Sequence, residues 1–508
     1  MGKKRWMAVC LAGCMILLAG CGKKESAAET GAEISKPAAE EQAEEEPENE
    51  NAPQVVLQEK ESRDWYSEDQ SIWYLHTDYV PVSISGTGYE ELKKGVETWW
   101  SEQEALILGQ SEVYAAYVRE DEGFQGEDYK YYIWESMETA RSDSQAVSLI
   151  VYDSAYTGGA HGDYVYTGVT FDVRSGEKLE LTDILEDAGG FRTEATDAII
   201  RYLREHYSDG LFPEYEDTVR SMWENNPNWY LDAAGITFIF NPYEVGPYAM
   251  GAVFVTLPYG DMAPYLQEAY RELPQAGIGR IPAGIPADIA GKSLLVNIDS
   301  SEDYGGSVFI EFANALTEVG SFGRLSDVYL IHREDGRVFL LLDADYASDD
   351  FVTFLYELTD GTLQARDRLE GVSLQDGNVN TELLTLRMHL DVLGSYYSMM
   401  DYRISEEGKL VQETENFTIT TDASPFRLLV TVKELPATVN GEEVLLPVGS
   451  RIRITATDNA GTAYFKDEDT GAEGSISYVR GDGAEDQWTL YIDGVQEYEY
   501  FEMIPYAG

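Results

Sequence analysis

The residues best suited to chemistry lie in one short glycine-rich segment, Tyr156-Thr-Gly-Gly-Ala-His-Gly162. Gly158 and Gly159 predict a tight turn, because glycine accepts positive φ values or a close backbone approach at little steric cost. His161 is one of only five histidines in the chain. A neutral imidazole can bind a metal or act as a base near neutral pH. We therefore take this segment as the first candidate site.

His161 also has a simpler interpretation, in which its ring holds the glycine turn by hydrogen bonds, and the sequence favours this one. No second ligand or base stands at helical spacing from His161. Asp153 and Asp163 are close in sequence, but sequence alone leaves open whether they converge on the ring. The candidate ligand-binding residues of the segment are Tyr156, Gly158, Gly159 and His161.

The elements that must position this segment form an α+β unit. Alternating apolar residues predict a strand before the segment and another after it, at 146–152 and 165–171. Leu92, Val96 and Trp99 recur at helical spacing and predict a helix over 88–106, and a second helix is expected over 193–207. Mixed strands and helices without a strict βαβ rhythm favour an α+β fold. Further strands are predicted at 113–118, 129–135, 236–240 and 252–257.

Four stretches of this unit resemble one known domain pair. They are 156–162, Phe171-Asp172 with Gly176, Trp229 followed by Ile236-Thr-Phe, and Tyr243-Glu-Val-Gly-Pro-Tyr-Ala-Met-Gly251 leading into Val255-Thr-Leu-Pro-Tyr259. The pair is a PdaC-like domain followed by its companion domain of unknown function. It occurs in the ectodomain of RsiV-type anti-sigma factors, which bind lysozyme, and ahead of the catalytic domain in PdaC-type peptidoglycan deacetylases. The resemblance covers about 65–266 and implies a PdaC-like α+β domain at 59–165 and the companion α+β domain at 166–274.

This resemblance implies an envelope ligand and adds Tyr243, Glu244 and Tyr248 to the candidate ligand-binding residues. We expect neither a cytoplasmic sigma-binding segment, because the chain begins with an export leader, nor a transmembrane helix. We also expect no deacetylase domain, because the few scattered histidines do not supply the Asp and His ligands that its metal needs. Anti-sigma signalling by this chain alone is therefore not expected.

The first residues read as an export leader. Lys3-Lys4-Arg5 is a basic start, 6–20 is apolar but too short to span a bilayer, and Leu18-Ala-Gly-Cys21 resembles a bacterial lipobox. We expect a lipoprotein signal peptide at 1–21, with lipid on Cys21 as the membrane anchor; the alternative is an ordinary signal peptide with a chance cysteine. All three cysteines lie in this leader, so the body has no disulfide. The acidic, apolar-poor stretch 22–58 predicts a disordered tether, and the protein is expected at the extracytoplasmic face of the cell membrane.

The second half predicts mostly strands. Prolines and glycines over 275–287 indicate a linker, and 288–435 predicts a β-rich domain with hairpins around 334–336, 360–361 and 406–408 and a short helix at 312–318. Regularly spaced strands over 436–508 resemble bacterial SH3-like domains and predict a small β-barrel. Its aromatic residues either form a ligand surface or pack the barrel, and packing is favoured. They are Trp488, Tyr491, Tyr498, Tyr500 and Phe501.

The chain is strongly acidic, with 92 acidic and 36 basic residues and a formal charge of −56. Such a surface repels nucleic acid and attracts cationic partners, although it also simply keeps a protein soluble. Two acidic clusters, Asp343-Ala-Asp345 with Asp349-Asp350 and Asp467-Glu-Asp469, are either solvated loops or Ca²⁺ sites, and solvated loops are favoured. HExxH, GxSxG, P-loop and CxxC motifs are absent from the sequence, so we assign no catalytic residue, cofactor or metal.

The sequence therefore predicts a multidomain protein, with an α+β N-terminal unit followed by β-rich domains that end in a small SH3-like barrel. The predicted function is a non-catalytic lipoprotein that binds an envelope ligand, either peptidoglycan glycan or a basic wall-active protein such as lysozyme. Two alternatives stay open. One is a wall-polymer hydrolase that uses acidic residues, and the other is a structural or assembly lipoprotein.

Overall fold

The computed structural model describes residues 52–69, 72–120, 124, 130–224, 226–299, 305–346, 350–419, 427–483 and 486–506. The predicted leader, Cys21 and the tether up to residue 51 lie outside the described residues. The chain from Asn49 to Gly508 forms one compact unit. The described part is multidomain and β-rich, with four α-helices among many strands and several separate hydrophobic cores. None of the described helices has the length and apolar character to cross a membrane.

The last residues of the predicted tether belong to the fold, so this part of the tether prediction is wrong. Strand β1 (Gln54–Leu57) pairs antiparallel with β4 (Val82–Ser85). Val55 and Leu57 alternate with partly exposed residues and are buried, which is the period of a half-buried strand. The folded chain therefore begins before residue 59.

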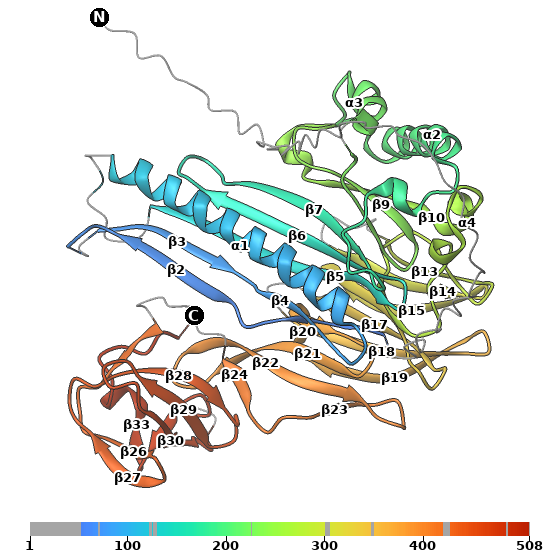
Figure 1. Ribbon diagram of the computed structural model, residues 1–508. Helices are drawn as coiled ribbons and strands as arrows, with labels where there is room; N and C mark the ends of the chain where they lie inside the picture. Colours follow the sequence, from blue (N-terminus) through green and yellow to red (C-terminus); the bar gives the residue numbers. More distant parts are fainter. Residues whose placement is uncertain are drawn as a thin grey trace, which may run out of the picture. The chain divides into compact units, whose positions relative to one another are not determined.

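One long helix, α1 (Glu90–Arg119), covers one face of the N-terminal sheet (Figure 1). The predicted helix over 88–106 is confirmed but too short, and the predicted strand at 113–118 is wrong. Ser111, Ala115 and Val118 continue the buried stripe of the helix at spacings of four and three residues. The strands of this sheet are β2 (Glu61–Tyr66), β3 (Trp73–Tyr79), β5 (Tyr131–Asp143), β6 (Ala146–Tyr156) and β7 (Asp163–Asp172).

The next segment packs helix α2 (Ala188–Tyr207) on a small sheet, as expected from the predicted helix and strands. Phe191, Ala195, Ile199 and Leu203 form the buried stripe of α2, and the Asp187 side chain accepts a hydrogen bond from the Gly190 N–H at its start. The other elements are η1 (Leu181–Ile184), α3 (Tyr215–Ser221), η2 (Met222–Glu224), β8 (Trp229–Leu231), β9 (Gly235–Phe240), η3 (Tyr248–Met250), β10 (Val253–Pro258), α4 (Tyr259–Met262), η4 (Ala263–Tyr265) and η5 (Glu268–Tyr270).

The segment predicted as a linker, 275–287, contains strand β11 (Gly277–Arg280), which lies between β5 and β16 (Arg324–His332). The N-terminal sheet therefore continues without a break into the second half of the chain. Gly277 allows this pairing, because a Cβ there would lie 2.6 Å from the Ser142 carbonyl oxygen of β5. Gly279 instead lets Ala233 approach β11, because a Cβ there would lie 2.7 Å from the Ala233 Cβ. The sheet continues through β17 (Val338–Asp345), β18 (Phe351–Thr359) and β19 (Thr362–Glu370).

A separate sheet packs against this region, and the short helix predicted at 312–318 is wrong. Ala313 and Asn314 both have positive φ, 50° and 67°, and form the two-residue turn of a hairpin there. The strands of this sheet are β12 (Ala287–Ile289), β13 (Lys292–Asp299), β14 (Gly306–Phe312) and β15 (Ala315–Phe322).

The C-terminal strands form a sheet that crosses the domain boundary predicted at 435/436. β28 (Arg451–Thr457) pairs with β24 (Phe417–Ile419) and β25 (Leu429–Val430), so the SH3-like barrel stays a prediction. Of its aromatic residues, Tyr500 and Phe501 are buried in the core, whereas Trp488 and Tyr498 are exposed. The remaining elements are β20 (Val372–Val379), β21 (Leu383–Asp391), β22 (Ser395–Ile404), β23 (Leu410–Gln412), β26 (Leu435–Val439), β27 (Glu442–Leu446), β29 (Thr462–Asp467), β30 (Glu473–Ser477), β31 (Val479–Arg480), β32 (Leu490–Ile492), β33 (Val495–Gln496) and η7 (Glu497–Glu499).

Candidate functional site

The glycine-rich segment is the turn between β6 and β7, and its glycines are needed for backbone shape. Gly158 and Gly159 have φ values of 86° and 112°, where side chains are strained. A Cβ at Gly162 would lie 2.8 Å from the Ala155 carbonyl oxygen. The hydroxyl of Tyr156, whose side chain is exposed, donates to the Gly159 carbonyl at 3.3 Å. The turn therefore presents His161 and Tyr156 at the surface on a fixed backbone.

His161 joins the two stretches that the sequence proposed as one site. Its ring stacks on Tyr248, with 4.1 Å between the centroids and 22° between the planes. The Tyr248 hydroxyl donates to the Gly162 carbonyl at 2.7 Å, and His161 Nδ1 lies 2.8 Å from the same oxygen. The ring thus holds the turn, as the favoured interpretation expected. Asp153 lies away from this contact, because in the β5–β6 register it is opposite Glu135.

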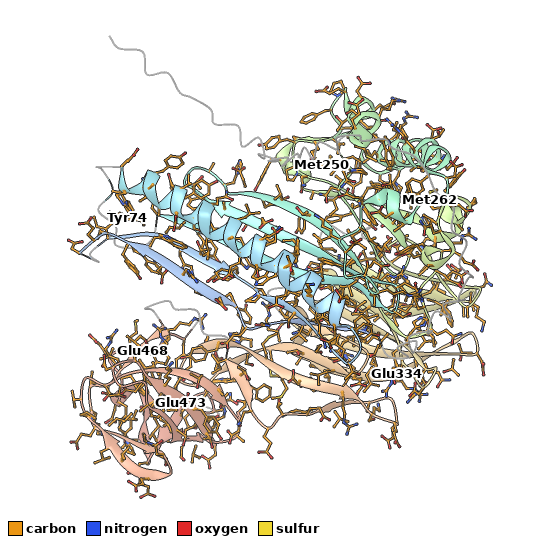
Figure 2. All side chains as sticks on the ribbon, in the orientation of Figure 1. Tyr74, Met250, Met262, Glu334, Glu468 and Glu473 are labelled. Atoms are coloured by element: carbon orange, nitrogen blue, oxygen red, sulfur yellow. The ribbon has the colours of Figure 1, made fainter. Side chains whose placement is uncertain are left out.

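The second loop holds Tyr243 in a strained conformation. Its φ is 73°, which is uncommon for an aromatic residue, and its side chain is 58% exposed. Glu244 stabilises the turn, because its carboxylate accepts from the Asn241 N–H at 2.8 Å. Met250, labelled in Figure 2, packs over Gly246, where a Cβ would lie 2.2 Å from the methionine Cε. Tyr243 also lies beside Tyr248, with ring centroids 5.8 Å apart.

Two asparagines fasten this loop region to the outer edge of β7. Asn241 Oδ1 accepts from the Tyr166 N–H at 2.7 Å, and Asn228 Oδ1 accepts from the Gly168 N–H at 2.9 Å. Both side-chain amides also donate to the Tyr166 carbonyl. The amides thus satisfy backbone groups that an unpaired strand edge would leave open. They fix the Tyr243 loop relative to the His161 turn.

A continuous run of aromatic rings, which the sequence analysis missed, leads away from these loops. Trp134 contacts Tyr152, Tyr152 contacts Tyr164, and Tyr164 contacts Tyr248, with ring centroids 5.4, 5.7 and 5.6 Å apart. Most of these rings are half-exposed. We call this set the aromatic track. Its members are Trp134, Tyr152, Tyr164, Tyr166, Phe254, Tyr248, His161 and Tyr243.

Strand pairing creates the aromatic track. Tyr152 and Tyr166 stand directly opposite each other in the β6–β7 register, and Tyr164 is two residues from Tyr166. Side chains two residues apart share one face of a strand, so all three lie on one face of the sheet. The Tyr164-Val-Tyr166 alternation was visible in the sequence, but its register with Tyr152 and Trp134 was not.

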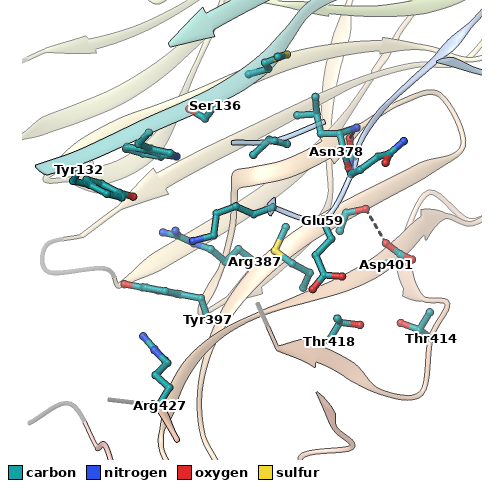
Figure 3. A pocket seen from close by; sticks show the side chains of 18 residues that line it. Glu59, Tyr132, Ser136, Asn378, Arg387, Tyr397, Asp401, Thr414, Thr418 and Arg427 are labelled. Atoms are coloured by element: carbon teal, nitrogen blue, oxygen red, sulfur yellow. Dashed lines mark hydrogen bonds between the residues drawn. The ribbon is translucent and has the colours of Figure 1, made fainter. Parts of the chain in front are cut away.

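The track ends at a cleft with a volume of about 590 Å³, shown in Figure 3. Trp134 belongs to both, and Tyr132 lines the cleft next to it on β5. The hydroxyl of Tyr132 donates to Asp78 at 3.0 Å, and the Lys60 ammonium, which also lines the cleft, lies 3.0 Å from the same carboxylate. The cleft wall is therefore braced by a cluster of charged groups.

His76 stands at the centre of that cluster. Its Nδ1 lies 2.6 Å from Asp64 and its Nε2 lies 3.0 Å from Asp78, so the protonated ring donates to both carboxylates. Burial acts to lower the pKa of His76, but the hydrogen bonds and charges of Asp64 and Asp78 outweigh it and raise the pKa to about 9. Burial also acts to raise the pKa of Asp78, and its hydrogen bond to His76 and the charge of Lys60 hold it well below its usual range.

The acidic clusters considered as Ca²⁺ sites make hydrogen bonds of their own. Asp343 is buried and accepts from the hydroxyls of Thr353 and Ser373. Asp467 accepts from the Asp469 and Thr470 N–H groups and shapes the turn after β29. Across the described ranges, no group of three His, Cys, Asp or Glu residues is arranged to hold a metal ion. Asp343 and Asp345 are buried in strand β17, so the favoured interpretation as a solvated loop is wrong for this part of the first cluster, and Asp349 lies outside the described residues. In the second cluster Asp467 is buried, whereas Glu468 and Asp469 are exposed in the turn after β29, as that interpretation expected.

Comparisons with known proteins identify one domain. Residues 182–260 match the family described as "Protein of unknown function (DUF3298)", so a DUF3298 domain is present, within the range predicted for the companion domain. It spans η1 to α4 and supplies the Tyr243–Tyr248 side of the loop contact. No curated protein matches this chain.

Two similar solved structures are both DUF3298 family proteins. The protein from Bacteroides fragilis is 20% identical and covers 44% of this chain and 96% of its own, with a TM-score of 0.34. The protein from Pseudomonas aeruginosa PAO1 is 16% identical and covers 43% of this chain and 95% of its own, with a TM-score of 0.31.

Proposed function

We propose that this protein is a non-catalytic lipoprotein, anchored by Cys21 at the extracytoplasmic face of the cell membrane, that binds an envelope glycan. The aromatic track is the observation that carries the proposal. The apolar face of a sugar ring packs on an aromatic ring while its hydroxyls stay hydrated or bind polar groups at the ring edge. A run of adjacent half-exposed rings offers several such contacts in a row, as a polymer requires.

The sequence resemblance to the PdaC-like domain pair supports the same proposal. Its two most distinctive stretches, 156–162 and 243–251, are the two loops that meet through His161 and Tyr248. Peptidoglycan glycan is the ligand that best combines this resemblance with the aromatic track. The lipobox at Cys21 supports a location at the outer face of the membrane, where that polymer is accessible.

A cationic wall-active protein such as lysozyme is a second candidate ligand. Tyr156 and Tyr243 are both exposed, and tyrosines in such positions are frequent anchors of protein interfaces. The exposed carboxylates Asp163 and Glu244 lie next to the two loops, in a chain with a formal charge of −56. A basic partner would be steered to this surface, and salt would weaken its binding.

The carboxyl pair Glu135 and Asp153 does not favour the hydrolase alternative. Burial and the neighbouring Asp153 raise the pKa of Glu135 to about 9. A glycosidase needs its two carboxyls at a ligand site, about 5 Å or more apart. Glu135 is instead buried, and it shares its face of β5 with Ile133, which packs in the core under α1. Alternation of side chains puts this face opposite Tyr132, Trp134 and Ser136, which line the cleft.

The test uses the chain from Asn49 to Gly508, because it forms one compact unit. We would measure its retention on purified peptidoglycan and its binding to lysozyme from about 50 to about 500 mM NaCl. Retention on peptidoglycan that changes little with salt is the expected result. Tyr164→Ala and Tyr243→Ala should each weaken it about tenfold, since each removes one ring contact worth roughly 1 kcal/mol or more.

Tyr117→Ala is the matched control, because Tyr117 is as exposed as Tyr243 but lies on α1, outside the track. If the protein binds lysozyme in a salt-sensitive way that depends on Tyr243, and is not retained on peptidoglycan, the ligand is a cationic protein and not the glycan. If the Tyr164→Ala and Tyr243→Ala variants still bind both ligands as tightly as the parent protein, the aromatic track has no role in binding. Binding of neither ligand by the parent protein would favour the assembly alternative.

A further inference from the structure

Two strand faces form much of the cleft at the end of the aromatic track. Tyr132, Trp134 and Ser136 alternate along β5 and form one wall. The opposite wall comes from β21 and β22, where the register pairs Thr385 with Asp401 and Arg387 with Met399. Alternation puts these side chains on the same face of each strand. The volume of about 590 Å³ falls in the range of roughly 300–1,000 Å³ that is typical of small-molecule sites.

One half of the cleft is cationic and aromatic. Figure 3 shows Arg387, Tyr397 and Arg427 on the same side as Tyr132. Only 8% of Arg387 is exposed, and its guanidinium carbon lies 4.2 Å from the centre of the Tyr397 ring. Arg427 donates to the Ser395 carbonyl at 2.6 Å. Stacking and hydrogen bonding thus orient two groups that are always charged and whose planar forks match a carboxylate.

The other half of the cleft offers acceptors and hydroxyls. Figure 3 shows Glu59, Asp401, Thr414 and Thr418 together on the opposite side of the view. Thr385 donates to one oxygen of Asp401 at 2.7 Å. Ionised carboxylates only accept hydrogen bonds, and threonine hydroxyls both donate and accept. This half therefore fits a ligand rich in hydroxyl groups.

From these two halves we propose that the cleft binds one acidic unit of a saccharide, a pyranose that carries a carboxylate. The carboxylate lies toward Arg387 and Arg427, the hydroxyls lie toward Glu59 and Asp401, and the ring packs near Trp134. The inference rests on the proposed function, since a glycan that follows the aromatic track reaches the cleft at Trp134, and it adds the chemistry of the unit that is recognised. Uronic acids and muramic acid both have this chemistry.

The experiment is a calorimetric titration of the Asn49–Gly508 chain with two matched pairs of monosaccharides. Glucuronic acid is compared with glucose, and N-acetylmuramic acid with N-acetylglucosamine. Within each pair the acidic sugar should bind at least tenfold more tightly, because only it offers a carboxylate to the guanidinium groups. The pair whose acidic sugar binds more tightly shows whether the cleft recognises a uronic acid or muramic acid. Equal affinity for acidic and neutral members of both pairs would overturn the proposal.

Arg387→Gln and Arg427→Gln should each reduce the acidic preference about tenfold or more and leave neutral binding almost unchanged. Arg403→Gln is the matched control, because Arg403 is exposed on β22 but does not line the cleft. Thermal denaturation checks that each variant is folded. If Arg387→Gln does not fold, the half-buried Arg427 still provides the test. Full acidic preference in both folded variants, or equal loss in Arg403→Gln, would overturn the proposal.

Failure here and failure of the proposed function give different results. A monosaccharide fills the cleft but is too short to follow the track, whereas retention of peptidoglycan depends on Tyr164 and Tyr243. Selective binding of an acidic monosaccharide without peptidoglycan retention would support the cleft and remove the proposed function. Track-dependent retention without acidic preference would leave the proposed function in place and overturn the cleft assignment.

Discussion

At the scale of single residues, His76 shows how a charge inside the sheet supports the wall of the cleft. Its ring lies between Asp64 and Asp78, and Asp78 also holds Lys60 and Tyr132, both of which line the cleft. Without the imidazolium, the two carboxylates would lose the partner that they share. The charge of His76 therefore contributes to stability and to the shape of the cleft wall.

This role predicts a specific pH dependence. The pKa of His76 is raised in the folded protein to about 9, above the ordinary value of about 6.5, so its stabilisation is complete below pH 6.5 and is lost as the pH rises through 9. We expect His76→Gln to lower the stability by roughly 3 kcal/mol at pH 6 and by much less at pH 9.5. Urea denaturation midpoints of both proteins across this range measure the gap. A gap that stays constant with pH would refute the role of the charge.

At the scale of elements, α1 packs closely against the turn that follows β7. A Cβ at Gly95 would lie 1.9 Å from the Gly176 carbonyl oxygen, and one at Gly176 would lie 2.1 Å from the Glu91 carbonyl oxygen. Both contacts involve backbone atoms, so a side chain cannot move aside to relieve them. Glycine at these positions brings helix and turn together, and the helix then covers the sheet that carries the track.

Two alanine substitutions in the same helix separate packing from helix propensity. Gly95→Ala should destabilise the protein by about 3 kcal/mol or more, because overpacking here forces backbone to move. Gly109→Ala is the matched control: a Cβ there has no neighbour within 4 Å, and alanine favours the helix by about 1 kcal/mol. Thermal denaturation should therefore move in opposite directions for the two variants. Equal shifts would show that the close approach does not limit packing.

Local elements were predictable where the sequence itself carries the geometry. Asp360-Gly361 predicted a hairpin turn, and both residues have the positive φ values that such a turn requires. The strand prediction at 113–118 is wrong because over so short a stretch the apolar residues fit both a strand period of two and a helical period of about 3.6. The buried stripe of α1 continues through this stretch, so it is helical. Local patterns therefore identified most strands, but they missed β1 and β11 and predicted a helix at 312–318 where the structure has a hairpin.

The candidate site was predictable only in part, for a related reason. The resemblance indicated the His161 and Tyr243 loops, which do meet through Tyr248. The aromatic track and the cleft depend on register and on pairing between distant strands. Trp134 and Arg387 are 253 positions apart, and no local pattern connects them. Long-range pairing of this kind is not encoded in spacing or composition.

At the scale of the whole molecule, the start of the folded chain is tied to its second half. The Asn378 side chain accepts from the Leu57 N–H at 2.7 Å and donates to the Leu57 carbonyl at 2.9 Å. Ser142 donates to the Pro53 carbonyl at 2.6 Å. These bonds join β1 to β20 and to β5, and Leu57 and Asn378 both line the cleft. The segment predicted as the end of a tether thus completes the lining of the cleft.

Cutting the chain at the predicted end of the tether should therefore damage both stability and binding. A chain that begins at Glu59 loses β1 and the burial of Val55 and Leu57, which costs about 3–6 kcal/mol relative to the chain from Asn49. Asn378→Ala in the longer chain removes only the two hydrogen bonds and should cost about 1–3 kcal/mol. Urea denaturation ranks the three proteins, and titration with glucuronic acid should show the weakest binding for the shortest chain. Identical midpoints for the two chain lengths would mean that β1 is dispensable, and the cleft would then have to form without Leu57.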